Sequence, residues 1–234
     1  MTQSVDGASP PVVVKVGGSL ARDPPALRRL MEALAATRPS PVIVPGGGAL
    51  ADAVRSLHGR GELTEATAHA MALLALDQVA LWLCELAGGA PGRVLPARGS
   101  DPDPAPASAA IVRSREEVER ALAADVLPVL APFDWLSREG PLPASWRVTS
   151  DSIAAWLAAR LGSRSLVLMK SFAFRESEVC PEDLGDAVDP FFLEALPPAV
   201  EVTFVDARDP GRAARALAGV TGAGTRLRAR GALG

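Results

Sequence analysis

Lysine is almost absent from this chain of 234 residues. Of its 24 lysines and arginines, only Lys15 and Lys170 are lysines, and each lies at or near the end of a short apolar run. Burying an isolated ammonium group costs several kcal/mol. Each lysine, if buried, therefore needs an anionic neighbour. For Lys15 this is a phosphate or carboxylate of a ligand, or an internal aspartate; for Lys170 a surface position is the alternative.

The chain also has few cysteines and no excess of basic charge. Cys84 and Cys180 are the only cysteines, and no C-x-x-C spacing occurs, which excludes a disulfide framework and a zinc site built from thiols alone. A formal net charge of −3 provides no field that would attract a polyanion, so nucleic acid is not an expected partner.

Targeting signals are the third absence. The first residues show no basic segment followed by an apolar one, and no run of about 18 uninterrupted apolar residues occurs. We therefore expect a cytoplasmic protein with no membrane partner. A chain of this length can bury a sizeable core, and we expect one domain over residues 11–234 after a flexible tail at 1–10.

Strand-like and helix-like segments alternate along the chain. Short apolar runs predict buried strands at 12–16, 41–45, 126–130, 165–169 and 200–205. Capping residues and apolar spacing predict helices at 23–36, 49–57, 64–86, 149–162 and 211–217. This order predicts a mainly parallel sheet with helices on both faces.

Two other segments stand out from this alternation. The helix expected at 64–86 is apolar on nearly all sides, so it must be covered by the rest of the chain or by a second copy, and a homodimer is our first expectation. Residues 96–106 contain too little apolar surface to pack and predict an exposed loop.

Three strand ends carry residues suited to anions. Gly17, Gly18 and Ser19 follow the first strand, glycines 46–48 follow the second, and Lys170 and Ser171 follow the fourth. Glycine lets backbone N–H groups approach a phosphate closely, and a helix N-terminus adds positive potential. The spacing matches neither a Walker nor a Rossmann fingerprint. We therefore expect phosphate-binding loops of another kind.

Four segments, in this order along the chain, resemble the amino acid kinase family. They are KVGGSL at 15–20, VPGGG at 44–48, TSDSIAAWLA at 149–158 and GTRL at 224–227. The resemblance implies a three-layer αβα sandwich around a mainly parallel sheet of about eight strands. It also implies an acceptor lobe at 11–140, a nucleotide lobe at 141–234, and ATP with Mg²⁺ as cofactors.

The resemblance assigns roles to individual residues. Lys15 and Lys170 would contact the transferring phosphoryl group, and Asp151 would orient both lysines. The nucleotide would be held by Gly17, Gly18, Ser19, Ser171 and Phe174. The acceptor would be held by Gly46, Gly47, Gly48, Asp52, Arg55, His69 and Thr149. For Asp151, a helix N-cap is the alternative role.

The chain also departs from the pattern of many family members. It lacks the Thr-Asp pair that commonly follows the strand ending here at Lys170, and it lacks a later Gly-Gly-Met stretch with its lysine. The second cationic role is therefore assigned to Lys170.

Within the family, residues 46–83 resemble the kinases of methanofuran biosynthesis that act on [5-(aminomethyl)furan-3-yl]methyl phosphate. Asp52 and Arg55 lie three residues apart, so they share one helix face and suit an amine and a phosphate respectively. A surface ion pair between them is the alternative, and His69 is equally compatible with a core or interface position. Another acceptor, such as isopentenyl phosphate or a carboxylate, and a non-catalytic nucleotide-binding protein remain alternatives.

Overall fold

A computed structural model of the chain describes residues 10–89, 108–139 and 142–228. Its centre is an eight-stranded sheet in the order β3-β4-β2-β1-β5-β7-β8-β6. Neighbouring strands are parallel except β7 and β8. The strands are β1 (Val13–Val16), β2 (Val42–Pro45), β3 (Ala109–Val112), β4 (Leu127–Leu130), β5 (Ser165–Lys170), β6 (Glu178–Val179), β7 (Glu201–Asp206) and β8 (Thr225–Leu227).

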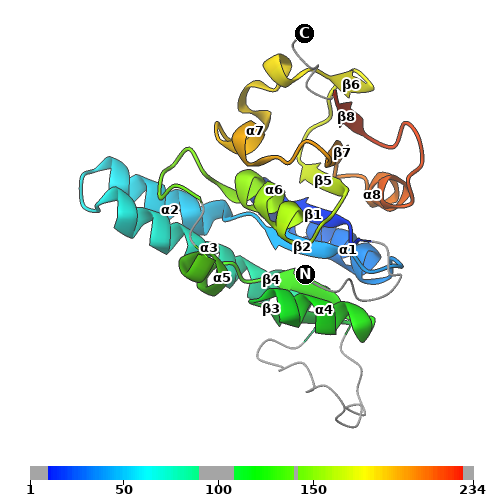
Figure 1. Cartoon of the computed structure of the whole chain (residues 1–234), viewed down its shortest axis with the longest axis horizontal. Helices are drawn as coiled ribbons and strands as arrows, with labels where there is room; N and C mark the ends of the chain where they lie inside the picture. Colours follow the sequence, from blue (N-terminus) through cyan, green and yellow to red (C-terminus); the bar gives the residue numbers. More distant parts are fainter. Residues whose placement is uncertain (1–9, 90–107, 140–141, 229–234) are drawn as a thin grey trace, which may run out of the picture.

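Helices cover both faces of this sheet and make three layers (Figure 1). The helices on one face are α1 (Pro24–Ala35), α3 (Glu65–Leu86) and α8 (Pro210–Leu217). Those on the other face are α4 (Arg115–Ala123), α5 (Phe133–Glu139), α6 (Ser150–Arg160) and α7 (Phe192–Ala195). The αβα sandwich predicted from the sequence is thereby confirmed.

Helix α2 (Gly48–Gly59) packs beside α3 and next to the short 3-10 helix η1 (Gly18–Arg22), beyond the carboxyl ends of the strands. Its position follows from the chain, because α2 begins within the glycine run that ends β2. This arrangement places one face of α2 over the loops that were expected to bind phosphate.

The five strands and five helices predicted from the sequence are all present, with bounds that differ by one or two residues. Asp23 caps α1 as predicted, since its side chain accepts a hydrogen bond from the Ala26 amide at 3.0 Å. Strands β3, β6 and β8 and helices α4, α5 and α7 were not predicted from the sequence. Strands β6 and β8 have two and three residues, too few for a periodic pattern.

Helix α3 was expected to need cover on every side. Among the described residues it is the one helix long and apolar enough to cross a membrane, but it packs on β2, β3, β4 and α1, as a core helix does. Leu74 and Leu81 on its outer side remain 42% and 40% exposed. The rest of the chain therefore covers α3 on most sides but not on all.

The expected tail falls on residues 1–9, which lie outside the described residues, as do 90–107, where the exposed loop was predicted. The division into lobes at residue 140 separates the strands up to β4 from those after it, at the β1 to β5 pairing. It remains a prediction.

Candidate active site

The candidate active site lies where β1 and β5 run side by side in the middle of the sheet. Both β2 and β5 pair with β1 in parallel, so the three predicted phosphate-binding loops emerge at the same edge. Strand order reverses here, and this is where open parallel sheets bind ligands. Two of the loops are joined directly, because the hydroxyl oxygens of Ser19 and Ser171 lie 2.9 Å apart.

The two glycine loops touch each other. A Cβ atom at Gly18 would lie 2.4 Å from the Gly48 nitrogen, and one at Gly46 would lie 2.4 Å from the Gly18 nitrogen. Gly48 also has a φ of +53°, which disfavours other residues. These glycines are therefore required first of all by the contact between the loops.

Not every glycine amide is available to a ligand. The Gly17 amide donates to the Met169 carbonyl oxygen at 3.0 Å, and the Gly46 amide donates to the Val16 carbonyl oxygen at 2.8 Å. These two amides are committed to the sheet. The amides at 18, 19, 47 and 48 remain candidates for contact with a phosphate.

Lys15, Asp151 and Lys170 form one buried cluster. Lys15 Nζ lies 3.0 Å from Asp151 Oδ1, and Lys170 Nζ lies 2.8 Å from Oδ1 and 3.0 Å from Oδ2. These residues are 5%, 5% and 7% exposed, in order along the chain, so Lys170 is not a surface lysine. Lys15 has the internal aspartate partner that the sequence analysis left open. One carboxylate nevertheless serves two ammonium groups, and the trio keeps a net positive charge.

The electrostatics of the cluster follow from burial and from these contacts. Burial alone would raise the pKa of the Asp151 carboxyl, but the two adjacent ammonium groups outweigh it and hold this pKa below its usual range. Burial and the neighbouring Lys15 lower the pKa of Lys170 to about 8, against the opposing effect of Asp151. The cluster therefore holds a firmly ionised carboxylate and an amine that titrates near neutral pH.

Asp151 is not the N-cap of α6, so the alternative role considered for it is wrong. Thr149 holds that position, and its side chain donates to Asp189 Oδ2 at 2.8 Å. Asp189 Oδ2 also accepts the amides of Thr149 and Ser152, each at 3.0 Å, and Asp189 Oδ1 accepts the Ser152 hydroxyl. A distant carboxylate thus fixes the first turn of α6, from which Asp151 projects.

The sequence analysis missed Asp189. It lies 38 positions after Asp151, in the segment before α7, and no local pattern relates it to the helix that it caps. Only the packing of α7 against α6 brings the two together.

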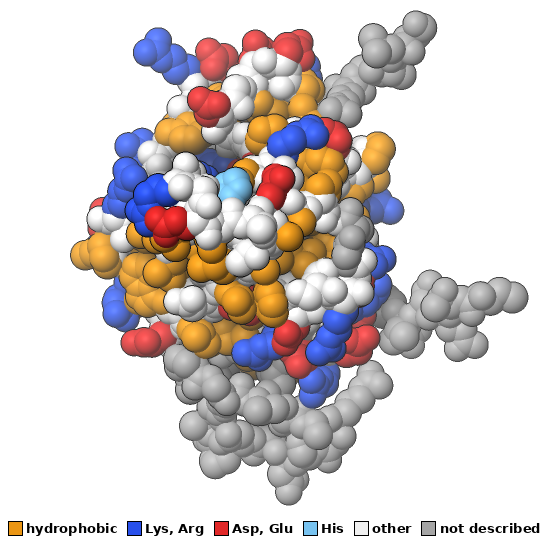
Figure 2. Space-filling view, turned by 90° about the vertical axis from the view of Figure 1, so that its left-hand side faces the viewer, with side chains coloured by type: hydrophobic (Ala, Val, Ile, Leu, Met, Phe, Trp, Pro, Cys, Tyr) orange, Lys and Arg blue, Asp and Glu red, His pale blue; other side chains and the backbone are white. Residues whose placement is uncertain are grey.

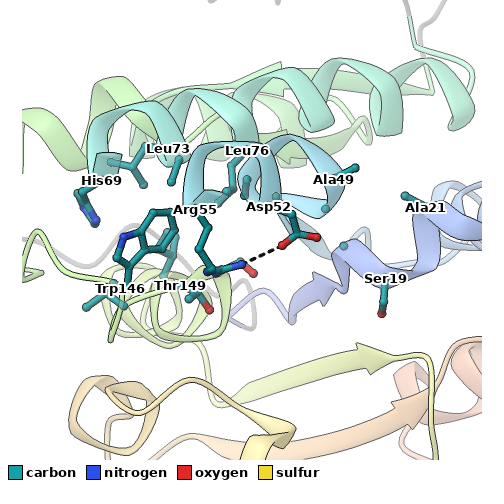
Figure 3. Close-up of a pocket in the computed structure, with 18 of the residues that line it drawn as sticks. Ser19, Ala21, Ala49, Asp52, Arg55, His69, Leu73, Leu76, Trp146 and Thr149 are labelled. Carbon is teal, nitrogen blue, oxygen red and sulfur yellow. Dashed lines mark hydrogen bonds and ion pairs between the residues drawn. The ribbon is translucent and has the colours of Figure 1, made fainter. Parts of the chain in front are cut away.

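A pocket of about 400 Å³ opens beside the glycine loops (Figure 3). It contains most of the residues expected to bind the acceptor, together with Trp146, which was not predicted. Its lining includes Gly47, Gly48, Asp52, Arg55, His69, Trp146 and Thr149.

Asp52 and Arg55 form the ion pair that was considered as an alternative. Arg55 Nη1 donates to Asp52 Oδ1 at 2.8 Å, and both side chains are at least half exposed. The Arg55 guanidinium also lies over the Trp146 ring, with Cζ 4.7 Å from the ring centroid. Both residues line the pocket and stay within reach of solvent.

A second hollow of about 230 Å³ adjoins this pocket, and His69, Leu73, Val148 and Ile153 line both. Apart from His69 and Ser137, the walls of the second hollow are apolar, with Phe133 and Leu136 among them. Partial burial lowers the pKa of His69, and Glu65 opposes that shift. His69 therefore lies at the boundary between a polar and an apolar compartment.

On the nucleotide side, Phe174 is engaged with its neighbours. Its ring meets Phe204 edge-on at a centroid distance of 5.0 Å and Phe172 at 5.5 Å. Phe172 is 39% exposed, while Phe174 is half-buried. A base-binding role for Phe174 remains a prediction, and Phe172 offers the more accessible ring.

A sequence model of the amino acid kinase family matches residues 10–173, which is more than half of the chain and includes the whole buried cluster. The chain belongs to the amino acid kinase family. It is accordingly a kinase, an ATP-dependent phosphotransferase. Among curated protein sequences, none matches this chain.

Solved structures of kinases share the fold. The chain matches uridylate kinase from Archaeoglobus fulgidus with a TM-score of 0.65 at 15% identity, over 93% of this chain and 100% of that one. UMP kinase from Ureaplasma parvum gives 0.65 at 13% identity, over 94% and 99%. Isopentenyl phosphate kinase from T. acidophilum gives 0.56 at 14% identity, over 93% and 100%. At these identities the likeness establishes the fold and leaves the acceptor open.

The described residues offer little to a metal ion. Within them, no three side chains of His, Cys, Asp or Glu are grouped as metal ligands, and both Asp151 oxygens already face ammonium groups. A protein cage for Mg²⁺ is therefore not present in the described part of the chain. A Mg²⁺ ion carried by the nucleotide phosphates would need few protein ligands.

Proposed function

We propose that this kinase transfers the γ-phosphoryl group of ATP to the phosphate group of a small phosphate monoester. The observation that carries the proposal is the buried trio of Lys15, Asp151 and Lys170, whose net positive charge lies next to the glycine loops. A buried uncompensated charge is costly. An anion at this edge of the sheet would remove that cost.

The proposed mechanism uses positioning and charge rather than a nucleophilic side chain. Phosphoryl transfer requires neutralisation of charge on the equatorial oxygens of the transferring group, and two ammonium groups with backbone amides can supply it. Asp151 holds Lys15 and Lys170 toward each other. A phosphate acceptor is already ionised at neutral pH, so no general base is assigned. A Mg²⁺ ion carried by the ATP phosphates would supply further neutralising charge there.

Different loops of the chain are proposed to hold the two substrates. Gly18, Ser19 and Ser171 are proposed to hold the nucleotide phosphates at the ends of β1 and β5. Gly47, Gly48, Arg55 and Thr149 are proposed to hold the acceptor phosphate in the adjoining pocket. Since the two glycine loops touch each other, donor and acceptor phosphates would meet at the lysines.

The preferred acceptor is [5-(aminomethyl)furan-3-yl]methyl phosphate, which would become the diphosphate in methanofuran biosynthesis. Asp52 would bind its ammonium group and Arg55 its phosphate. In the free protein the two side chains pair with each other at the pocket wall. An exposed ion pair of this kind is worth at most about 1 kcal/mol, so a substrate can replace it at little cost.

A second acceptor is favoured by a separate observation. The apolar hollow beyond His69 adjoins the acceptor pocket, and an isopentenyl phosphate could place its hydrocarbon there. An amine-bearing acceptor depends on Asp52, whereas a prenyl acceptor depends on the hollow.

An ADP-release assay across these acceptors and a carboxylate substrate would test the proposal. We expect turnover with the aminomethylfuran phosphate and loss of its advantage in Asp52→Asn. Turnover of isopentenyl phosphate alone, unaffected by Asp52→Asn, would replace the preferred acceptor by the second one. Turnover of the carboxylate alone would overturn a phosphate acceptor altogether.

We also propose that the protein forms a homodimer through the outer side of α3. Exposed Leu50, Leu74 and Leu81 lie on α2 and α3, and Figure 2 shows hydrophobic side chains gathered on the side of the molecule where these helices lie. Light scattering should give a dimer for the wild type and a monomer for Leu74→Glu. A monomeric wild type would contradict this proposal.

A further inference from the structure

Among the described residues that line the acceptor pocket, Trp146 and His69 are the only two with aromatic rings. It belongs to the loop that leads into α6, and it faces α2 across the pocket (Figure 3). Neither its position in the sequence nor the resemblance to the kinase family singled it out. Its contacts nevertheless connect it to Arg55.

A hydrogen bond at the edge of the Trp146 ring holds the ring in one orientation. Its indole Nε1 donates to His58 Nδ1 at 2.9 Å, and the two rings lie 5.9 Å apart at an interplanar angle of 50°. His58 stands on α2, one turn after Arg55. The hydrogen bond therefore fixes the plane of the indole relative to the helix that carries Arg55.

The loop around Trp146 is fixed as well. The Arg147 carbonyl oxygen accepts the Phe191 amide at 3.1 Å, and the Thr149 amide donates to Asp189 at 3.0 Å. Trp146 is half-buried and comes immediately before these anchored positions. The ring is thus placed by the fold before any ligand arrives.

The face of the indole carries the Arg55 guanidinium, with Cζ 4.7 Å from the ring centroid. Stacking fixes the plane of a guanidinium but uses none of its N–H donors. One donor is engaged by Asp52, and that pair is exposed. A stacked arginine therefore keeps a fixed edge of donors for a second, bidentate partner such as a phosphate.

We propose that Trp146 is a positioning residue for the acceptor phosphate, which it serves by holding Arg55 in the plane that a bidentate contact requires. His58 supports this role by fixing the indole edge. The inference rests on the proposed contact between Arg55 and the acceptor phosphate. It adds a residue that determines how strongly phosphate acceptors bind, without touching the transferring phosphoryl group.

Nuclear magnetic resonance offers a test that does not depend on turnover. The chain has four tryptophans, so a ¹H–¹⁵N spectrum has four indole N–H signals, and Trp146→Phe identifies the one that is lost. Inorganic phosphate or the aminomethylfuran phosphate should shift this signal in the wild type. The shift should be absent in Arg55→Lys, which keeps the charge but loses the planar fork. Arg60→Lys, at the C-cap of the same helix and outside the pocket lining, is the matched control and should respond as the wild type does.

Kinetics provide the second test. Trp146→Leu should raise KM for the acceptor about tenfold and leave KM for ATP within about twofold, because the lost stacking acts only through Arg55. Trp146→Phe keeps a ring face and should restore most of the affinity. In an Arg55→Lys background, Trp146→Leu should add no further effect. Thermal unfolding of each variant separates these changes from general loss of structure.

The outcomes are distinguishable. A phosphate-dependent shift that persists in Arg55→Lys, or an acceptor KM unchanged in Trp146→Leu, would overturn the role of Trp146. A wild type that turns over none of the phosphate acceptors but shows the Arg55-dependent shift would refute the proposed function and support the positioning role. Absence of both turnover and shift would refute both.

Discussion

Lys15, Asp151 and Lys170 stand on two central strands and on the first turn of α6, whereas Asp52 and Arg55 stand on the face of α2 that lines the pocket. The first group is almost fully buried, and each of its contacts is made by residues far apart in the sequence. The second group is at least half exposed and pairs within one helical turn. Both regions combine a carboxylate with cations, but burial fixes the first group in place, whereas the second group is exposed to solvent.

From this difference we infer different roles for the two regions. A charge cluster in the sheet cannot be altered without leaving a buried charge unpaired, so it suits the step that every phosphoryl transfer requires. An exposed pair on a helix can be changed at little cost in stability. On the proposed function, the pocket wall is therefore where acceptor preference can vary while the fold stays the same.

Removal of Lys15 should give the largest effect on activity. Lys15→Ala should lower kcat by about 10²–10³, because one of two charges that stabilise the transition state is lost. ATP binding, measured by calorimetry, should persist. Arg138→Ala, which removes an exposed cation on α5, is the control and should leave kcat unchanged. Full turnover by Lys15→Ala would remove this lysine from the mechanism.

Loss of the shared carboxylate should give the largest effect on stability. Asp151→Asn leaves two buried ammonium groups without a counter-charge, and we expect the free energy of unfolding to fall by about 3–5 kcal/mol. Urea unfolding would measure this change. The double variant Asp151→Asn with Lys170→Met removes one of the unpaired charges and should recover part of the loss. Equal stability of Asp151→Asn and the wild type would show that the cluster is solvated.

The dependence of kcat/KM on pH should reveal the titration of Lys170. Its pKa is lowered to about 8 by burial and by Lys15. The protonated form is the one that we propose neutralises phosphoryl charge. Raising the pH through this pKa removes a cation, so kcat/KM, which reports on the free enzyme, should fall above about pH 8. Bound ATP favours the charged amine and should move the corresponding fall in kcat to higher pH.

Arginine at this position provides the control for the pH profile. A guanidinium stays charged throughout the accessible range, so Lys170→Arg should lack the alkaline fall even if its activity is lower. An alkaline fall that is identical in Lys170→Arg would assign the titration to another group.

The smallest effect on stability should come from the exposed pair. Asp52→Asn should change the free energy of unfolding by less than about 1 kcal/mol. It should raise KM about tenfold for an amine-bearing acceptor, with KM for ATP unaffected. Glu119→Gln removes the acid of a comparable exposed pair on α4 and should change neither constant. A large loss of stability in Asp52→Asn would show that the exposed pair stabilises the fold as the buried cluster does.

Much of the site was accessible from local patterns. Two lysines at apolar strand ends predicted a need for anions, and glycine runs after β1 and β2 predicted the loops that line the site. These signals are local, because a strand and the loop after it are contiguous. The apolar runs also identified the strands that lie at the centre of the sheet.

Other features had no local signal. Asp189 and Trp146 act on partners that lie far along the chain, so neither could be placed without the packing of α7 and of the loop before α6. The short strands β6 and β8 likewise depend on neighbours for their hydrogen bonds, and with two and three residues they are too short to show a period of two.

Local patterns along the chain were enough to identify five of the strands and five of the helices, and to show that a buried lysine in the first strand requires a negative partner. Tertiary structure alone decided that one carboxylate serves both lysines, because β1, β5 and α6 converge only in the folded sheet. It also decided that Arg55 lies against an indole from another segment. Burial and charge balance act between residues that are distant in sequence, so they are settled by packing and not by local pattern.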